Sequence, residues 1–322
     1  MNNMIKKLST QKSELKRIVP FIAVMLCVLL ASCVDENLDD CPPAIKTTAS
    51  LRFEYTLNDS YKDLLSTEVT HLDILVYDKD GSYLKTYQTE QSKLENGNTF
   101  PLDLEAGTYT LVAWANITTD YETNFIPKLE DMFVKLNTSA YGEADPAHGS
   151  LFHGMTTMSI KAQQDNRATV SLTKNTNLLN VILEDTDDKS VLKEGDFKIQ
   201  ITGCNGTYNY ENKMAGGELL NYIPRYTNAD NNTMQAQFTL LRLLQEDDLR
   251  ITITSPKGDV IYDEALTAKI MESPDFNSDE DLDRTQEYTL RYEITQKDDG
   301  AWSINLLFIN DWDVTKQGGG IS

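Results

Sequence analysis

The sequence predicts an all-β protein with two tandem antiparallel β-sandwich domains, preceded by a lipoprotein signal peptide. Short segments in which apolar and polar residues alternate recur along the chain, as in residues 47–57, where Leu51, Phe53 and Tyr55 share one face of an extended strand. Turn residues separate such segments about every 8 to 12 positions, which is typical of sandwiches rather than of α/β units. No fixed short period is present, so solenoids and propellers are disfavoured.

The first domain is predicted to span residues 47–174. Residues 58–65 are expected to form one or two helical turns after the first strand, and residues 69–88 a hairpin, because Asp80-Gly81 is a strong turn signal. Residues 117–146 are rich in Asn, Thr and Asp and are expected to form a long surface excursion. The other strands of this domain are expected within residues 100–116, 149–160 and 167–174.

The second domain is predicted to span residues 175–322 and to repeat the same plan. Two strands are expected on either side of Asn205-Gly206, and a final pair on either side of a turn at Asp298-Asp299-Gly300. The remaining strands are expected within residues 177–185, 233–243, 249–266 and 286–314.

Residues 1–32 have the pattern of an export signal. Five basic residues and one acid come first, followed by an apolar run over residues 18–31 that is shorter than the roughly 20 residues a membrane-spanning helix needs. The run ends in Leu30-Ala31-Ser32-Cys33, which resembles the bacterial lipobox. That resemblance implies cleavage before Cys33 and acylation of this cysteine with chains such as palmitate, which would anchor the protein in a membrane.

Residues 33–46 are predicted to be an acidic tether. Asp35, Glu36, Asp39 and Asp40 cannot pack into a core and favour a solvated linker. This acidic run also resembles the signal that directs lipoproteins of the Bacteroidales group to the outer face of the outer membrane.

Charge excludes one class of partner. The whole chain has a net charge of −21, and removal of residues 1–32 leaves 24 basic and 49 acidic residues, a net charge of −25. Nucleic-acid binding requires clustered Lys and Arg that release phosphate counterions, so nucleic acid is not an expected partner.

Two cysteines remain beyond the signal and the lipid-bearing residue. Cys41 and Cys204 could form a disulfide that joins the tether to the second domain, as an oxidising envelope would permit, or they could both be free thiols. The sequence leaves these two alternatives open, because it does not give the distance between the two residues.

No motif for catalysis, cofactor binding or metal binding is present, so neither a cofactor nor a small-molecule substrate is expected. Asp78 and Asp80 could begin a calcium loop, but the later ligands are missing and the hairpin turn explains the pair. The histidines, His71, His148 and His153, have no HExxH spacing and no cysteine nearby, and His153 is interpreted as structural. Trp114, Trp302 and Trp312 could stack on sugars, but sandwich cores commonly contain such residues.

Several segments, in this order, resemble the fimbrillin-associated anchor proteins of Bacteroidales-type fimbriae. They are Cys33, "DDCPP", "LRFEYTL", "LDILVYDKDGSYL", "GTYTLVAWAN", "SLFHG", "ITGCNGTYNYEN" and "FINDWDV". The resemblance covers nearly all of the mature chain and implies two transthyretin-like domains, a lipid at Cys33, fimbrillin subunits as partners, and a place at the base of a fimbria in the outer membrane. There the anchor would hold the polymer and limit its length.

The resemblance also implies a way of joining, in which a strand of one subunit completes a sheet of the next. Residues 304–314 are the candidate donor strand, or else a resident strand of the second domain. Three alternatives to the anchor remain: a glycan-binding surface lipoprotein, a stalk or tip subunit of the fimbria, and a lipid-tethered hydrolase. Stalk subunits are expected to lose an N-terminal strand to a protease, whereas an anchor is expected to keep its chain from Cys33 onward.

Overall fold

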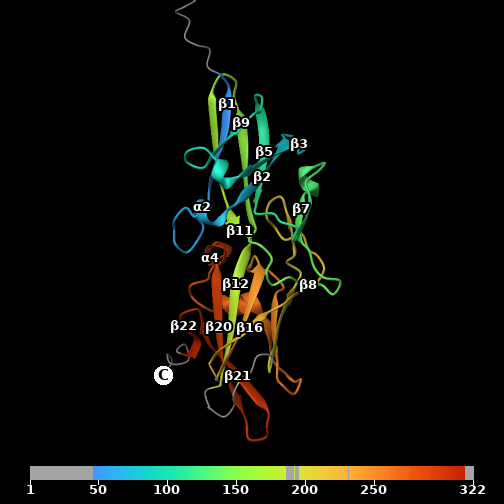
Figure 1. The fold of residues 1–322 in the computed structure, drawn as a ribbon, viewed down its shortest axis with the longest axis vertical. Coiled ribbons are helices and arrows are strands. Elements are labelled where there is room, and N and C mark those ends of the chain that lie inside the picture. The colour runs from blue at the N-terminus through green and yellow to red at the C-terminus, as the bar shows by residue number, and fades with distance from the viewer. Residues whose placement is uncertain (1–45, 186–191, 193–195, 231, 316–322) are drawn as a thin grey trace, which may run out of the picture. The chain divides into compact units, whose positions relative to one another are not determined.

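Five β-sheets form the framework of the computed structural model, which describes residues 46–185, 192, 196–230 and 232–315 (Figure 1). The predicted all-β fold class is confirmed. The α-helices of these residues are short: α2 (Leu65–Glu68), α3 (Leu266–Ile270) and α4 (Asp279–Arg284), with 3-10 turns η2 (Gln91–Lys93) and η3 (Leu129–Asp131). None of the described helices is long and apolar enough to cross a membrane.

Two sheets belong entirely to the predicted first domain. The first sheet has the strand order β10-β1-β4, with β10 Asp165–Ser171, β1 Thr48–Glu54 and β4 Thr99–Leu102. The second sheet has the order β11-β9-β5-β2-β3, with β11 Thr173–Lys174, β9 Phe152–Ile160, β5 Gly107–Ala115, β2 His71–Asp78 and β3 Tyr83–Glu90. Side chains of both sheets form one buried cluster, the first core, which includes Leu51, Phe53, Leu72, Ile74 and Phe152.

Strand β2 is buried on both of its faces. Leu72, Ile74 and Val76 point into the first core, whereas Leu75 and Tyr77 on the opposite face belong to a second, larger cluster, the second core. Burial on both faces explains why the sequence of this strand is almost continuously apolar rather than alternating.

The predicted excursion over residues 117–146 contains strands instead. A third sheet has the order β14-β7-β6, with β14 Thr207–Asn209, β7 Phe133–Leu136 and β6 Tyr121–Asn124, and β8 (Glu143–Ala144) pairs with β15 (Leu220–Tyr222). Tyr121, Val134 and Leu136 are buried in the second core beside Tyr77 and Trp114. These residues therefore cover the outer face of the second sheet while pairing with strands of the C-terminal half.

The C-terminal half contributes two larger sheets around the second core. The fourth sheet has the order β19-β18-β13-β15-β8, with β19 Val260–Ala265, β18 Arg250–Thr254 and β13 Lys198–Gly203. The fifth sheet has the order β16-β17-β12-β20-β21-β22, with β16 Arg225–Asp230, β17 Thr233–Leu241, β12 Thr176–Asp185, β20 Glu287–Gln296, β21 Trp302–Ile309 and β22 Trp312–Asp313. The turn at Asp298-Asp299-Gly300 joins β20 to β21 as predicted, with Gly300 at φ +80°.

Asn205-Gly206 is not a hairpin turn, so the interpretation of this dipeptide as a hairpin signal is wrong. The strands before and after it, β13 and β14, lie in different sheets. Asn205 is buried, accepts a hydrogen bond from the Tyr222 hydroxyl (2.6 Å) and donates one to the Arg242 carbonyl. The side chain thus stabilises a crossing between sheets, which local sequence cannot distinguish from a turn.

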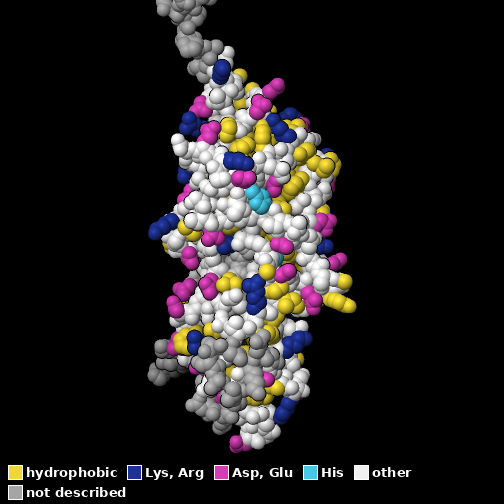
Figure 2. Space-filling view, in the orientation of Figure 1, with side chains coloured by type: hydrophobic (Ala, Val, Ile, Leu, Met, Phe, Trp, Pro, Cys, Tyr) yellow, Lys and Arg dark blue, Asp and Glu magenta, His cyan; other side chains and the backbone are white. Residues whose placement is uncertain are grey.

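The described residues from Thr47 onward form one compact unit, because the third and fourth sheets take strands from both sides of residue 174. The predicted boundary at residue 174 coincides with the end of β11, which is the last strand of the second sheet in chain order. On the face seen in Figure 2, Asp and Glu side chains are scattered among Lys and Arg rather than gathered in one patch.

Candidate functional site

The N-terminal attachment point that the sequence predicts begins outside the described residues. Cys33, the predicted lipid-bearing residue, and Cys41 both lie there. The described chain enters the fold through Thr47 and Thr48 at the start of β1. This strand lies between β10 and β4, so the segment that leads from the tether is a central strand of the first sheet and not an edge strand.

Cys204 has intermediate exposure and no disulfide partner among the described residues. Its backbone N–H donates to the Asp248 carboxylate (2.7 Å), and a hydrogen bond with Asp248 raises the pKa of its thiol. A raised pKa keeps the thiol protonated and lowers its reactivity as a nucleophile. Because Cys41 lies outside the described residues, the disulfide between Cys41 and Cys204 stays a prediction.

Residues 304–314, the candidate donor segment, lie in the resident strands β21 and β22 in this structure. Strand β21 pairs with β20 in antiparallel register from Leu290↔Ile309 to Gln296↔Trp302. Its other edge pairs with β22 at Phe308 and Ile309 only. Within the described residues, no strand is hydrogen-bonded to the outer edge of β21 before Phe308, and an edge with unpaired main-chain groups can accept a further strand.

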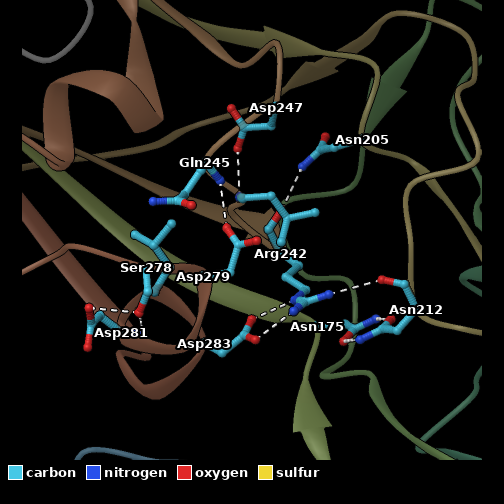
Figure 3. A network of polar contacts seen from close by, with 12 residues as sticks. Asn175, Asn205, Asn212, Arg242, Gln245, Asp247, Ser278, Asp279, Asp281 and Asp283 are labelled. Carbon is cyan, nitrogen blue, oxygen red and sulfur yellow. Dashed lines mark hydrogen bonds and ion pairs between the residues drawn. The ribbon is translucent and has the colours of Figure 1, made fainter.

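A polar network occupies the junction between the two predicted domains (Figure 3). Arg242, which follows β17, forms two hydrogen bonds with the Asp283 carboxylate of α4, at 2.5 Å and 2.6 Å. Its third bond goes to the carbonyl of Asn212 (3.0 Å). Burial raises the pKa of the Asp283 carboxyl, and the hydrogen bonds from Arg242 oppose this shift. The network positions the end of β17, α4 and the loop after β14 against one another.

Further contacts extend this network to Asn175, at the start of the predicted second domain, and link the nearby Tyr210 to β9 of the first. Asn175 and Asn212 exchange two side-chain hydrogen bonds, and both residues are buried. The His153 ring donates from Nε2 to the Tyr210 carbonyl (2.8 Å), and it packs edge-on against Trp114. Because a buried polar group without a partner is costly, these paired groups favour one fixed arrangement of the elements that carry them.

The histidines and tryptophans have structural surroundings. His153 and His148 are buried, and burial lowers the pKa of both rings, that of His153 to about 4. The His71 ring contacts the carbonyl of Ile117 (2.7 Å). Trp114 is fully buried, and Trp302 packs against Phe197, as expected for core residues. Among the described residues, no group of three or more His, Cys, Asp or Glu could hold a metal ion.

Asp78 and Gly81 form the predicted hairpin turn between β2 and β3. The Asp78 carboxylate accepts hydrogen bonds from the backbone N–H groups of Asp80 and Ser82, and Gly81 has φ +74°. The Asp78 carboxylate therefore stabilises the turn through hydrogen bonds to its backbone, which confirms the interpretation of this stretch as a hairpin.

Sequence reasoning did not identify the Arg242–Asp283 pair or the exchange of strands between the halves. With 50 acidic residues in the chain, no local pattern marks the one that pairs with Arg242. The run "YETNFIP" at residues 121–127 does contain alternating β-prone residues, which is a signal for β6 that the high Asn and Thr content obscured.

Packed, mostly antiparallel β-sheets around two buried cores define the chain as an all-β protein. The match to known families is more specific: residues 38–318 match the family of fimbrillin-A associated anchor proteins Mfa1 and Mfa2, and the chain belongs to this family. The predicted resemblance is thereby confirmed, and the family is that of fimbrial anchor or accessory proteins. A search of curated proteins found no match.

Solved structures show the same fold. The fimbrial anchor protein Mfa2 from Porphyromonas gingivalis superimposes with a TM-score of 0.71 at 20% identity, covering 83% of this chain and 98% of that one. A proposed adhesin from Bacteroides ovatus superimposes with a TM-score of 0.74 at 20% identity, and the match covers 87% of this chain and 97% of that one. A proposed polysaccharide-binding protein from Bacteroides thetaiotaomicron superimposes with a TM-score of 0.73 at 22% identity, and the match covers 78% of this chain and 93% of that one.

Proposed function

We propose that this chain anchors a fimbria to the outer membrane through lipid on Cys33, limits the length of the polymer, and joins it by strand complementation. Membership of the anchor family over residues 38–318 is the observation that carries the proposal. The lipobox-like run ending at Cys33 supplies a physical means of attachment, because several acyl chains together hold a protein stably in a bilayer. In this account residues 47–174 and 175–322 act as two domains joined by shared sheets.

Deletion of the gene tests the anchoring role. Cells that lack the chain should release their filaments into the medium, and the released filaments should be longer than normal, because neither attachment nor length control remains. Complementation with the intact chain should restore short, cell-bound filaments. Filaments of normal length that stay on the deletion strain would refute the proposal.

We propose the outer edge of β21 as the place where a fimbrillin strand joins. Main-chain groups at an open edge give affinity, and the side chains of alternate residues give specificity. Asn305 is exposed on β21, and Thr227 is exposed on β16 at the opposite edge of the same sheet. A photo-crosslinking residue at position 305 should capture fimbrillin on cells, and one at position 227 should not. Capture at position 227 alone would refute this location of the joint.

A stalk or tip subunit is the alternative within the family. A stalk subunit is expected to lose its N-terminal strand, which here would be the central strand β1. Mass spectrometry of the chain from isolated fimbriae should show peptides of residues 47–57 if the chain is the anchor. Their absence from the assembled subunit would favour the stalk.

Glycan binding is a second candidate function, favoured by the description of the structure from B. thetaiotaomicron as a proposed polysaccharide-binding protein. The strongly exposed tyrosines of the described chain, Tyr61 and Tyr141, could stack on sugar rings. Affinity electrophoresis in polysaccharide gels would detect such binding, and a loss of retardation in Tyr61→Ala or Tyr141→Ala would locate it.

A further inference from the structure

Strand β1 receives any tension applied through the tether, because the chain enters this strand directly from Thr47. It pairs with β10 in parallel over seven residue pairs, from Thr48↔Asp165 to Glu54↔Ser171. On its other side it pairs with β4 over four residues, from Ala49↔Leu102 to Arg52↔Thr99. Both neighbours must therefore be separated from β1 before the strand can leave the sheet.

The direction of the strands determines how a pulling force acts on them. The tether meets β1 at its N-terminal end, whereas the chain leaves β10 at its C-terminal end and continues through β11 into β12 of the C-terminal half. Since β1 and β10 are parallel, tension between the tether and the C-terminal half pulls the two strands in opposite directions along their own axes. All of the paired residues then resist together, whereas a force across the strands would separate one pair at a time.

Side-chain bonds reinforce both ends of this strand pair. The Thr48 hydroxyl donates to Asp165 Oδ1 (2.8 Å) at the entry, and the Ser171 hydroxyl donates to Glu54 Oε1 (2.9 Å) at the exit. The Leu172 N–H donates to the Glu54 carbonyl (2.8 Å), and the Asn166 side chain donates to the Thr48 carbonyl (3.0 Å). Any sliding of β1 along β10 would break these bonds at once.

Sliding would also displace buried apolar side chains. Leu51 and Phe53 of β1 have no exposed surface, and Val170 of β10 is 1% exposed. All three belong to the first core. Because interiors are close-packed, moving these side chains along the strand axis brings them out of their sites and creates cavities.

We propose that β1 and β10 form a shear clamp, which gives the chain the further function of carrying tension between its N-terminal attachment and the C-terminal half. The clamp rests on the proposed function for the source of the tension and for its direction. It assigns β1 a mechanical role besides that of an ordinary strand of the first core.

The C-terminal half repeats this arrangement. Its first strand, β12, is parallel to β20 over eight pairs, from Leu178↔Glu287 to Asp185↔Ile294. The chain enters β12 at its N-terminal end and leaves β20 at its C-terminal end towards β21. A polymer that pulls on β21 would therefore load β12 and β20 in shear as well, and the two clamps would lie in series along the chain.

Optical-tweezers measurements on the full chain can separate the two loading geometries. One DNA handle is coupled at position 46 in both cases. The second is coupled at Thr169, an exposed residue near the C-terminal end of β10, or at Gln163, an exposed residue whose N–H contacts the Thr47 hydroxyl beside the entry to β1. Handles at 46 and 169 load the strands in shear, whereas handles at 46 and 163 unzip the same strands from their N-terminal ends.

We expect the rupture force for positions 46 and 169 to exceed that for positions 46 and 163 by at least about twofold at the same loading rate, because forced unfolding reports the unfolding rate along the pulled direction. Both arrangements release almost the same length of chain, so the comparison is matched. Equal forces, or a higher force in the unzipping geometry, would overturn the clamp. The measurement needs no fimbria, so failure of the anchoring proposal would leave its result unchanged, and failure of the clamp would leave the gene-deletion result unchanged.

Discussion

Arg242 and Asp283 form a nearly buried ion pair that fastens the end of β17 to α4, with 14% and 7% of the two side chains exposed. Both carboxylate oxygens accept hydrogen bonds from the guanidinium, and its third nitrogen, Nη1, donates to the Asn212 carbonyl. Such a pair adds little to stability as a whole, but the loss of one partner leaves a charge that is buried and unpaired. The attachment of α4 to the end of β17 therefore depends on both residues together.

Arg242→Met should lower the free energy of unfolding by about 3 kcal/mol, because the Asp283 carboxylate would remain in the interior without its cation. Chemical denaturation monitored by tryptophan fluorescence would measure the loss. Arg250→Met is the matched control, since the Arg250–Asp263 pair is about half exposed and should contribute less than about 1 kcal/mol. Equal losses in the two variants would contradict the account of the junction.

Gly154→Ala should destabilise the first domain by about 1 to 3 kcal/mol, the range typical of overpacked cores. A Cβ atom at this position of β9 would lie 2.6 Å from Val170 Cγ1 and 2.8 Å from the Ser171 carbonyl. The first and second sheets would have to move apart at this point. Thermal unfolding of the variant would show the change.

Gly149→Ala is the control for that substitution. Its added Cβ would meet nothing closer than the Thr118 methyl group at 3.7 Å, so stability should stay within about 0.5 kcal/mol of the parent chain. A Gly154→Ala chain as stable as the Gly149→Ala chain would show that the two sheets are not closely packed there.

His153 should make the fold sensitive to mild acid. Burial lowers the pKa of its ring to about 4 in the folded chain, against an ordinary value of 6.5. Between these values the unfolded chain binds a proton that the folded chain does not, so stability is complete above pH 6.5 and falls as the pH drops towards 4. The loss in the free energy of unfolding should reach about 3 kcal/mol.

Denaturation series between pH 4 and pH 7 would test this dependence. His153→Gln should flatten the curve in this window, because the amide can still donate to the Tyr210 carbonyl but does not titrate. His71→Gln should keep the slope, since His153 is intact in that variant. An unchanged slope in His153→Gln would assign the acid sensitivity to other groups.

The strands and several turns of this fold could be predicted because their signals are local. Alternation along β1 and the Asp80-Gly81 dipeptide each act over a few residues, and the structure confirms both. The pairing of β7 with β14 and of β8 with β15 could not be predicted, since it depends on which distant strand offers a free edge. Asn205-Gly206 shows the same limit, because a buried partner, Tyr222, determines its conformation.

The candidate site was only partly accessible to sequence reasoning. Cys33 stays a prediction from the residues before it, because a lipobox is a pattern along the linear chain and Cys33 lies outside the described residues. The polar network around Arg242 could not, because Asn175, Asn212 and Asp283 are far apart in sequence and are brought together only by the fold. The parallel pairing of β1 with β10 likewise depends on the three-dimensional arrangement.

The most direct test of the central claim is the fraction of filaments that stay on cells expressing Cys33→Ser, measured by immunoblotting washed cells and medium for fimbrillin. Cys204→Ser, which alters a thiol on the folded domain, is the control. Attachment through Cys33 predicts that filaments move to the medium in the first variant and stay on the cell in the second. Filaments that remain on Cys33→Ser cells at the normal level would contradict the account.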